Sequence, residues 1–150
     1  MLTQADFWQV IKHIPQLIKD EEDNNYALYT AELKEVLGST MEPINIKQWL
    51  ETYCDFRSKL DIIEIDLAID QYYAGLEDEE LEYFKDWIVS RGQSDYEAVL
   101  ENPDYLKQLV QTCINCLYGD FAEIPLMVWD DLYKSELGEM VEYLSNNNIT

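Results

Sequence analysis

Apolar residues recur along most of this chain at the spacing of an α-helix, and this pattern limits the fold more than any other feature. Near the start they fall three and four residues apart, at Phe7, Trp8, Val10, Ile11 and Ile14. A stripe of this period marks the buried face of an amphipathic helix. Thr3 stands before the stripe as its N-cap, and Asp6 lies in the first turn, where a carboxylate favours the helix dipole.

Glycines and prolines divide the pattern into segments. Gly38, Gly75 and Gly92 stand where helices end in a left-handed cap, and Pro43 and Pro103 stand where helices open. The chain holds only 5 glycines and 4 prolines, too few for a turn-rich β fold, and its 47% apolar residues are enough for a full core. The sequence therefore predicts an all-α fold, a single compact domain (1–150) of about seven to nine helices.

The segments between these breaks define the expected helices. We expect them at residues 26–37, 43–58, 60–73, 77–91 and 103–118, with two short helices in a C-terminal extension at 120–145. The pattern leaves open whether the helix that Pro43 begins breaks near Ser58 or runs on into 60–73. Ser94 and Glu97 have the spacing of a capping box and predict one more short helix. The segment 60–73 is apolar on most sides, which predicts the central buried helix. Its β-branched residues leave a strand as the competing interpretation.

Net charge is the second unusual feature of the sequence. The chain has 10 Lys and Arg against 31 Asp and Glu, a formal charge of −21. Residues 76–150 carry 17 acids and 4 bases, so −13 of this charge lies in the second half. Such a polyanion repels DNA, RNA and anionic membranes, and it attracts basic surfaces. We expect a basic protein as partner, no nucleic acid and no membrane. The alternative is that the acidity serves only solubility.

The sequence carries no signal for export or membrane insertion. No apolar stretch approaches the roughly 20 residues of a transmembrane helix, and the start of the chain lacks a basic region followed by an apolar run. Cys54, Cys113 and Cys116 are an odd number without a disulfide framework. These features favour a cytoplasmic location.

No residue pattern indicates a reaction centre. Cys113 and Cys116 form a lone CxxC inside an expected helix, and a zinc site needs two more ligands, so we interpret both as buried apolar side chains. His13 is the sole histidine and has no motif for acyl transfer beside it, which favours a surface or packing residue. A calcium-binding DxDxDG loop is also missing. We expect no catalytic residue, no metal and no cofactor.

Two aspartates in the segment 60–73 need a cation near them. Asp66 and Asp70 are four residues apart, share a helical face and lie beside apolar positions. Two partly buried carboxylates repel each other unless a cation neutralises them. Arg57, Lys59 or Arg91 can supply it within the domain, because buried charges are normally paired. The functional alternative is that a partner's Lys or Arg supplies it.

Carboxylates beside aromatic residues are the candidate binding sites. Tyr and Trp next to acids form strong binding centres for Arg-rich partners. The acids at 77–80 also have a purely structural explanation, since they begin a helix and favour its dipole. The residues expected to bind a partner are Asp66, Asp70, Tyr73, Glu77, Asp78, Glu79, Glu80, Tyr83, Asp130 and Asp131.

Several short blocks resemble a known family. They are Phe7-Trp8, Gly75 with the acids after it, Phe84, Trp87, Gly92, Tyr96-Glu97 and Pro103-Asp104. In this order they resemble a bacterial domain of unknown function, number four-two-four-zero, over most of residues 5–110. The chain departs from the family where Asp66 and Asp70 replace aromatic residues and Ala74 replaces a turn glycine. The resemblance implies an α-helical domain and implies no activity.

Three functions remain in view. The first is a small binding protein, not an enzyme, that neutralises a basic protein. Its most concrete form is an immunity protein that inhibits a nuclease-like toxin by direct binding. The second is a metal-dependent hydrolase built on carboxylates, which predicts acids gathered in a cleft. The third is a regulatory or assembly module without catalytic activity.

Overall fold

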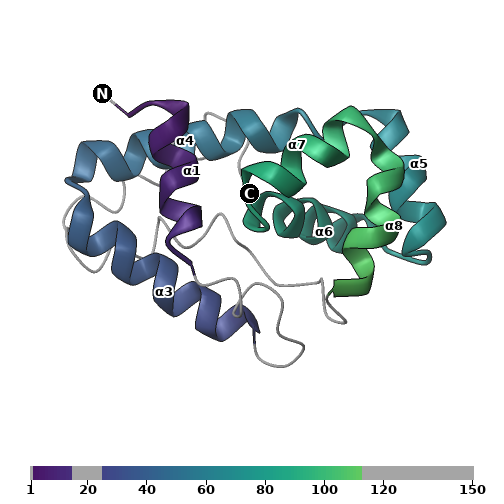
Figure 1. Ribbon diagram of the computed structural model, residues 1–150, viewed down its shortest axis with the longest axis horizontal. Helices are drawn as coiled ribbons and strands as arrows, with labels where there is room; N and C mark the ends of the chain where they lie inside the picture. Colours follow the sequence, from purple (N-terminus) through teal and green to yellow (C-terminus); the bar gives the residue numbers. More distant parts are fainter. Residues whose placement is uncertain (1, 15–24, 113–150) are drawn as a thin grey trace.

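Seven α-helices and two 3₁₀ turns, with no strand, form the part of the chain that the computed structural model describes, residues 2–14 and 25–112 (Figure 1). The elements are α1 (Gln4–Lys12), α3 (Asn25–Thr40), α4 (Pro43–Ser58), α5 (Ile63–Tyr72), α6 (Asp78–Ser90), α7 (Gln93–Glu101), η1 (Pro103–Tyr105), α8 (Leu106–Leu109) and η2 (Val110–Thr112). The predicted all-α fold is confirmed. The CxxC pair Cys113 and Cys116, the acids Asp130 and Asp131, and the extension at 120–145 lie outside the described residues.

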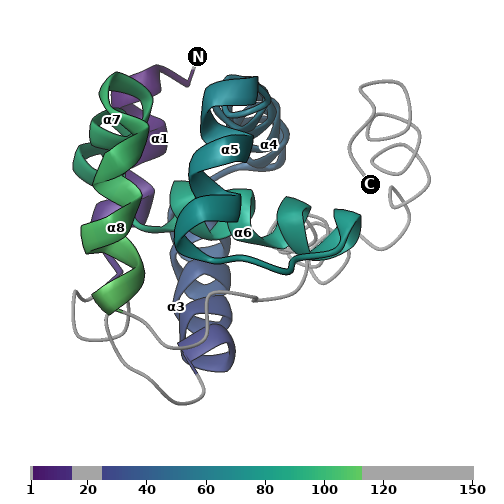
Figure 2. The same cartoon turned by 90° about the vertical axis from the view of Figure 1, so that its right-hand side faces the viewer.

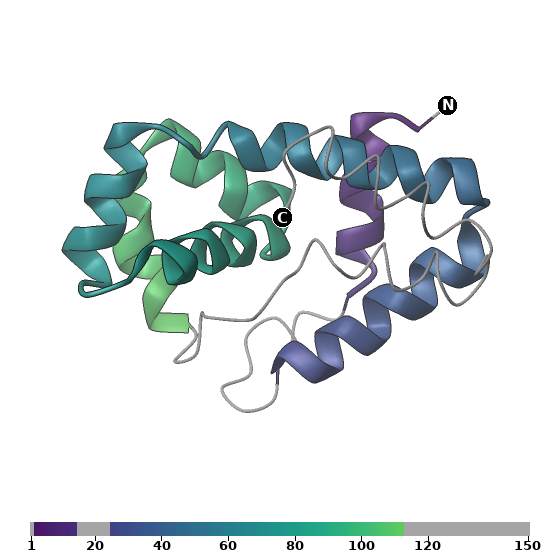
Figure 3. The same cartoon turned by 180° about the vertical axis from the view of Figure 1, so that it is seen from behind.

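Helix α4 runs along one side of the molecule and links its two ends (Figures 1 and 3). At one end α1 crosses α4 and also contacts α3. Toward the other end α6 packs against α4 and α7, while α5 contacts η1 and α8. Seen from the end where α5 lies, α7 and α8 stand on one side of α4 and α5 (Figure 2).

Helix α1 forms as the sequence predicts. The Thr3 hydroxyl accepts a hydrogen bond from the Asp6 N–H (3.1 Å), and the Thr3 N–H donates to the Asp6 carboxylate (2.9 Å), which completes a capping box. These bonds from Thr3 hold the pKa of Asp6 below its ordinary value. Phe7 is fully buried and its ring stacks on Trp49, with the centroids 4.7 Å apart. The Trp49 indole N–H donates to the Phe7 carbonyl (3.4 Å), so α1 and α4 share the centre of the core.

The central buried helix is α6 and not the predicted segment 60–73. Every residue of α6 from Phe84 to its end is buried. In α5, Ile65, Ala68 and Ile69 face the core, whereas Ile63 and Leu67 are each 62% exposed. The prediction was wrong because this short helix is apolar on two faces, and the neighbouring helices cover only one of them.

Gly38 does not cap a helix as predicted. Helix α3 continues through Gly38 to Thr40, and the Met41 N–H still donates to the Leu37 carbonyl (3.2 Å). Only two residues then precede Pro43, which begins α4 as expected. The proline, rather than the glycine, sets the boundary between α3 and α4.

The capping box predicted at Ser94 is also wrong. Gly92 adopts a left-handed φ of +109° directly after α6 and serves as the N-cap of α7. The Tyr96 N–H donates to the Gly92 carbonyl (3.0 Å), so α7 begins at Gln93 and contains Ser94. Asn102 caps the turn that Pro103 opens, since its side chain accepts from the Asp104 N–H (3.2 Å).

Candidate functional site

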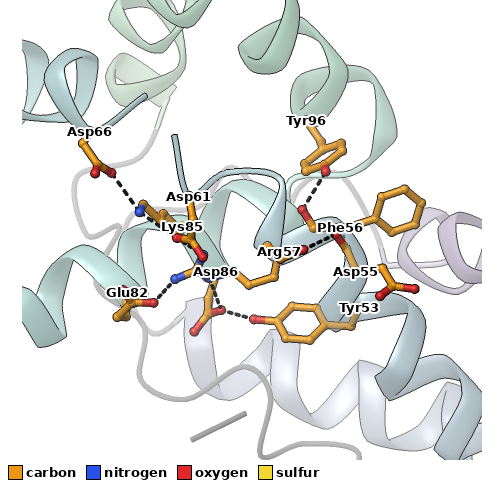
Figure 4. Close-up of polar contacts among 11 residues, drawn as sticks. Tyr53, Asp55, Phe56, Arg57, Asp61, Asp66, Glu82, Lys85, Asp86 and Tyr96 are labelled. Carbon is orange, nitrogen blue, oxygen red and sulfur yellow. Dashed lines mark hydrogen bonds and ion pairs between the residues drawn. The ribbon is translucent and has the colours of Figure 1, made fainter. Parts of the chain in front are cut away.

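Two cations and four carboxylates meet where α4, α5 and α6 come together (Figure 4). The Lys85 Nζ lies 2.9 Å from Asp61 Oδ1 and 2.8 Å from Asp66 Oδ1. Arg57 reaches Asp61 (3.0 Å) and Asp86 (3.4 Å), and it also pairs with Glu82. The Tyr53 hydroxyl donates to the Asp86 carboxylate. We call this set the Arg57–Lys85 network: Tyr53, Arg57, Asp61, Asp66, Glu82, Lys85 and Asp86.

The network buries its cations and exposes most of its carboxylates. The side chains of Lys85 and Arg57 are 3% and 11% exposed, whereas Asp61 and Glu82 are 53% and 58% exposed. Four negative charges against two positive charges leave the network at −2. It therefore ties three helices together while the surface above it stays negative.

Asp66 is paired inside the domain, by a residue that the sequence analysis did not consider. The cation is Lys85, not Arg57, Lys59 or Arg91. Arg91 instead pairs with Asp95 (3.3 Å), and the Lys59 Nζ lies 5.4 Å from the centre of the Phe56 ring. The 2.8 Å contact between Lys85 and the buried Asp66 Oδ1 is an ion pair and not a well-directed hydrogen bond.

The other predicted binding residues divide into structural and exposed ones. Glu80 is structural, because its carboxylate accepts the Glu77 N–H (3.1 Å) at the start of α6. Tyr73 is half-buried, with its ring 5.3 Å from that of Phe84. Tyr83 donates its hydroxyl to Glu79 (2.6 Å), one turn away on α6. Exposed acids are Asp70, Glu77, Asp78 and Glu79, and they border the turn that joins α5 to α6.

The exposed charge of this region is entirely negative. From Asp61 to Glu101 the chain has 13 acids and 2 bases, a balance of −11, and both bases, Lys85 and Arg91, are buried. Residues 60–106 thus present no exposed Lys or Arg. We call the exposed acids of α5, α6 and the segments just before them the acidic surface: Asp61, Glu64, Asp70, Glu77, Asp78, Glu79 and Glu82.

Asp61 joins the network to the acidic surface, and its ionisation is shifted. Partial burial alone raises the pKa of Asp61, but hydrogen bonds and charge attraction from Lys85 and Arg57 together outweigh burial. The pKa of Asp61 therefore lies below its ordinary value of 3.8. A carboxylate with a depressed pKa stabilises the fold above its ordinary pKa, and this stabilisation disappears as the pH falls through the lower, folded-state value.

We expect the substitution Asp61→Asn to lower the free energy of unfolding at pH 7 and to have little effect in acid. Asn keeps the size of the side chain but removes the charge that Lys85 and Arg57 stabilise. Urea unfolding of both proteins from pH 7 down to below 3.8 measures the difference in stability. The two curves should converge at the acid end. A difference that stayed constant across this range would contradict the assigned role of Asp61.

Cys54 and His13 lie outside the Arg57–Lys85 network. Burial raises the pKa of the Cys54 thiol to about 12, with Asp55 and Glu51 adding to the shift, so little thiolate forms near neutral pH. His13 is the exposed C-cap residue of α1 and borders an open cleft of about 320 Å³.

Among residues 2–14 and 25–112, no three His, Cys, Asp or Glu side chains gather in a way that could hold a metal ion. None of the described helices is long and apolar enough to span a bilayer.

Lys85 is the functional residue that the sequence analysis missed, although a signal for it exists. On α6 it belongs to the apolar stripe of Leu81, Phe84 and Ile88, at the spacing i, i+3, i+4 and i+7. A lysine on the buried face of a helix implies a buried acidic partner. The exposure of Ile63 and Leu67 had no comparable signal, because both residue types are normally buried.

One comparison with known proteins identifies the family of this chain. A protein-family model described as "Protein of unknown function (DUF4240)" matches residues 2–135. This span includes every described helix and the whole acidic surface, and it confirms the family resemblance found in the sequence. No curated protein and no solved structure matches the chain.

Proposed function

Since the chain belongs to DUF4240, a family described as proteins of unknown function, we propose its role from the acidic surface: it is a binding domain for a basic protein. The observation that carries this proposal is the burial of Lys85 and Arg91. Because of it, the whole stretch 60–106 offers exposed carboxylates without an exposed cation.

Burial of the bases favours binding over simple solubility. Soluble proteins usually intersperse exposed charges of both signs, and net charge alone keeps them in solution. A surface with one sign of charge instead creates a directed field that speeds association with an oppositely charged partner. The Arg57–Lys85 network contributes to that field, since it holds the two cations inward and leaves Asp61 and Glu82 in water.

In its most concrete form the partner is a toxin with a cationic active surface, such as a nuclease. A nuclease uses Lys and Arg to bind phosphates. An acidic domain of this size can occupy those residues and block the substrate. The chain then acts as an immunity protein, without chemistry of its own.

The test is to coexpress the full chain with the product of the gene adjacent to its own and to measure growth, then binding by calorimetry. We expect protection, and an affinity that falls as salt is raised. The triple variant Glu64→Gln, Asp70→Asn, Asp78→Asn should bind about tenfold more weakly at low salt.

The matched control neutralises three exposed acids on α3 and α4, by Glu35→Gln, Glu51→Gln and Asp55→Asn. It changes the net charge equally and should leave the affinity within about twofold, because these acids belong to α3 and α4 and not to the acidic surface. If both triple variants lost affinity equally, the loss would reflect the net charge of the chain and not the acidic surface. A chain that neither binds nor protects would remove the toxin as partner.

A further inference from the structure

The outer face of α5 carries an apolar patch that the helices of residues 2–14 and 25–112 leave uncovered. Ile63 and Leu67 are each 62% exposed, and Ile62, just before the helix, is 40% exposed. Single exposed apolar residues are ordinary, but three within six residues form a patch. The patch is not needed for packing, because the opposite face of α5 already fills the core with Ile65, Ala68 and Ile69.

Carboxylates border this patch on the helix surface. Residues three and four apart are neighbours on a helix, so Leu67 has Ile63 and Glu64 on one side and Asp70 on the other. All four side chains are exposed. Asp66, also beside the patch, is held by Lys85, whose own amine is buried. The result is an apolar centre with an acidic rim on α5, a helix that lies at the end of the molecule facing the viewer in Figure 2.

We propose that this face of α5 is the centre of the binding surface and that it receives a basic amphipathic helix of the partner. The proposal rests on the proposed function, and it adds where the partner docks and what it must present. Apolar residues of that helix, one turn apart, pack on Ile63 and Leu67, while its Lys and Arg pair with Glu64 and Asp70. An amphipathic helix laid on an apolar surface is a recurrent recognition mode.

Charge selects this occupant over the alternatives. A second copy of a chain with net charge −21 brings a like-charged rim to the patch and is repelled. A cationic rim on the partner is attracted, and its apolar residues supply the part of the affinity that salt does not screen. Interfaces commonly combine such an apolar core with a polar rim.

The test uses the full chain and two labelled helical peptides of the same composition. In one, leucines at i and i+4 form a single stripe among lysines; in the other, the leucines are dispersed. We expect the striped peptide to bind more tightly. The double variant Ile63→Ser, Leu67→Ser should lose at least about tenfold in affinity for it. Ile44→Ser, at a 54% exposed isoleucine of α4, is the matched control and should bind like the wild type.

The outcomes separate this inference from the proposed function. If the serine variant binds the striped peptide normally while the Glu64, Asp70 and Asp78 triple variant is weakened, the patch is not the docking site and the acidic surface still is. If neither variant changes binding, both proposals are overturned. Circular dichroism checks that the variants fold. A full chain that is dimeric in ultracentrifugation, with the dimer lost in the serine variant, would assign the patch to a second copy and overturn the proposed occupant.

Discussion

Replacing Lys85 by Met is expected to lower the free energy of unfolding by about 3 kcal/mol. The methionine keeps an unbranched apolar chain of similar length in the buried site, so the loss comes mainly from the missing charge. Without the ammonium group, the buried Oδ1 of Asp66 loses the cation 2.8 Å away. Asp61 loses one of its two cationic partners and keeps Arg57. The value lies at the low end for broken buried pairs, because both carboxylates keep partial contact with water.

Urea denaturation of the wild type, Lys85→Met and the double variant Lys85→Met, Asp66→Asn measures this effect. The double variant should recover much of the loss, because no uncompensated charge remains at position 66. Lys107→Met removes an exposed lysine of α8 and should change the stability by less than about 0.5 kcal/mol. A Lys85→Met protein as stable as the Lys107→Met control would show that the Arg57–Lys85 network does not hold α5 on α6.

Truncation of Trp49 to alanine should cost about 4 kcal/mol, the largest single loss that we expect. The indole is fully buried, stacks on Phe7 and donates to its backbone carbonyl, so one side chain joins α4 to α1. Alanine leaves a cavity between two helices and removes the side-chain hydrogen bond that joins α4 to the Phe7 carbonyl of α1. A loss of this size is a large fraction of the 5–15 kcal/mol that typically stabilises a domain.

The measurement is urea unfolding of Trp49→Ala beside Ile44→Ala, which shortens an exposed apolar residue of the same helix. Ile44→Ala should stay within about 0.5 kcal/mol of the wild type. If Trp49→Ala cost less than about 1 kcal/mol, the packing of α1 against α4 would not depend on this contact. Tryptophan fluorescence cannot serve as the only signal here, so far-ultraviolet circular dichroism follows the unfolding of both variants.

Local signals in the sequence predicted much of the fold. Thr3 with Asp6, Pro43 and Gly92 mark helix boundaries through hydrogen bonds and dihedral limits that act within a few residues, and the structure places all of them at such boundaries. The errors arose where two local signals competed. At Gly38 a possible cap stood five residues before a proline, and the proline decided where α3 ends.

The candidate site was harder to predict because it depends on contacts between distant segments. The acids of α5 and α6 are visible in the sequence, but the burial of Lys85 and Arg91, which makes the surface purely acidic, follows from packing. Arg57 and Glu82 are 25 residues apart and pair only after α4 and α6 come together. The apolar face of α5 shows the same limit, since a helix with two apolar faces does not reveal which one its neighbours cover.

The burial of Lys85 and Arg91 also determines where trypsin can cleave the folded protein. Trypsin cleaves after Lys and Arg, and between Lys59 and Lys107, both exposed, these two are the only such residues. Within this stretch, trypsin can therefore cut the folded protein only at its two ends. A cut between them requires α6 to open. The helices that carry the acidic surface thus form one protease-resistant unit, whose digestion reports unfolding and not surface accessibility.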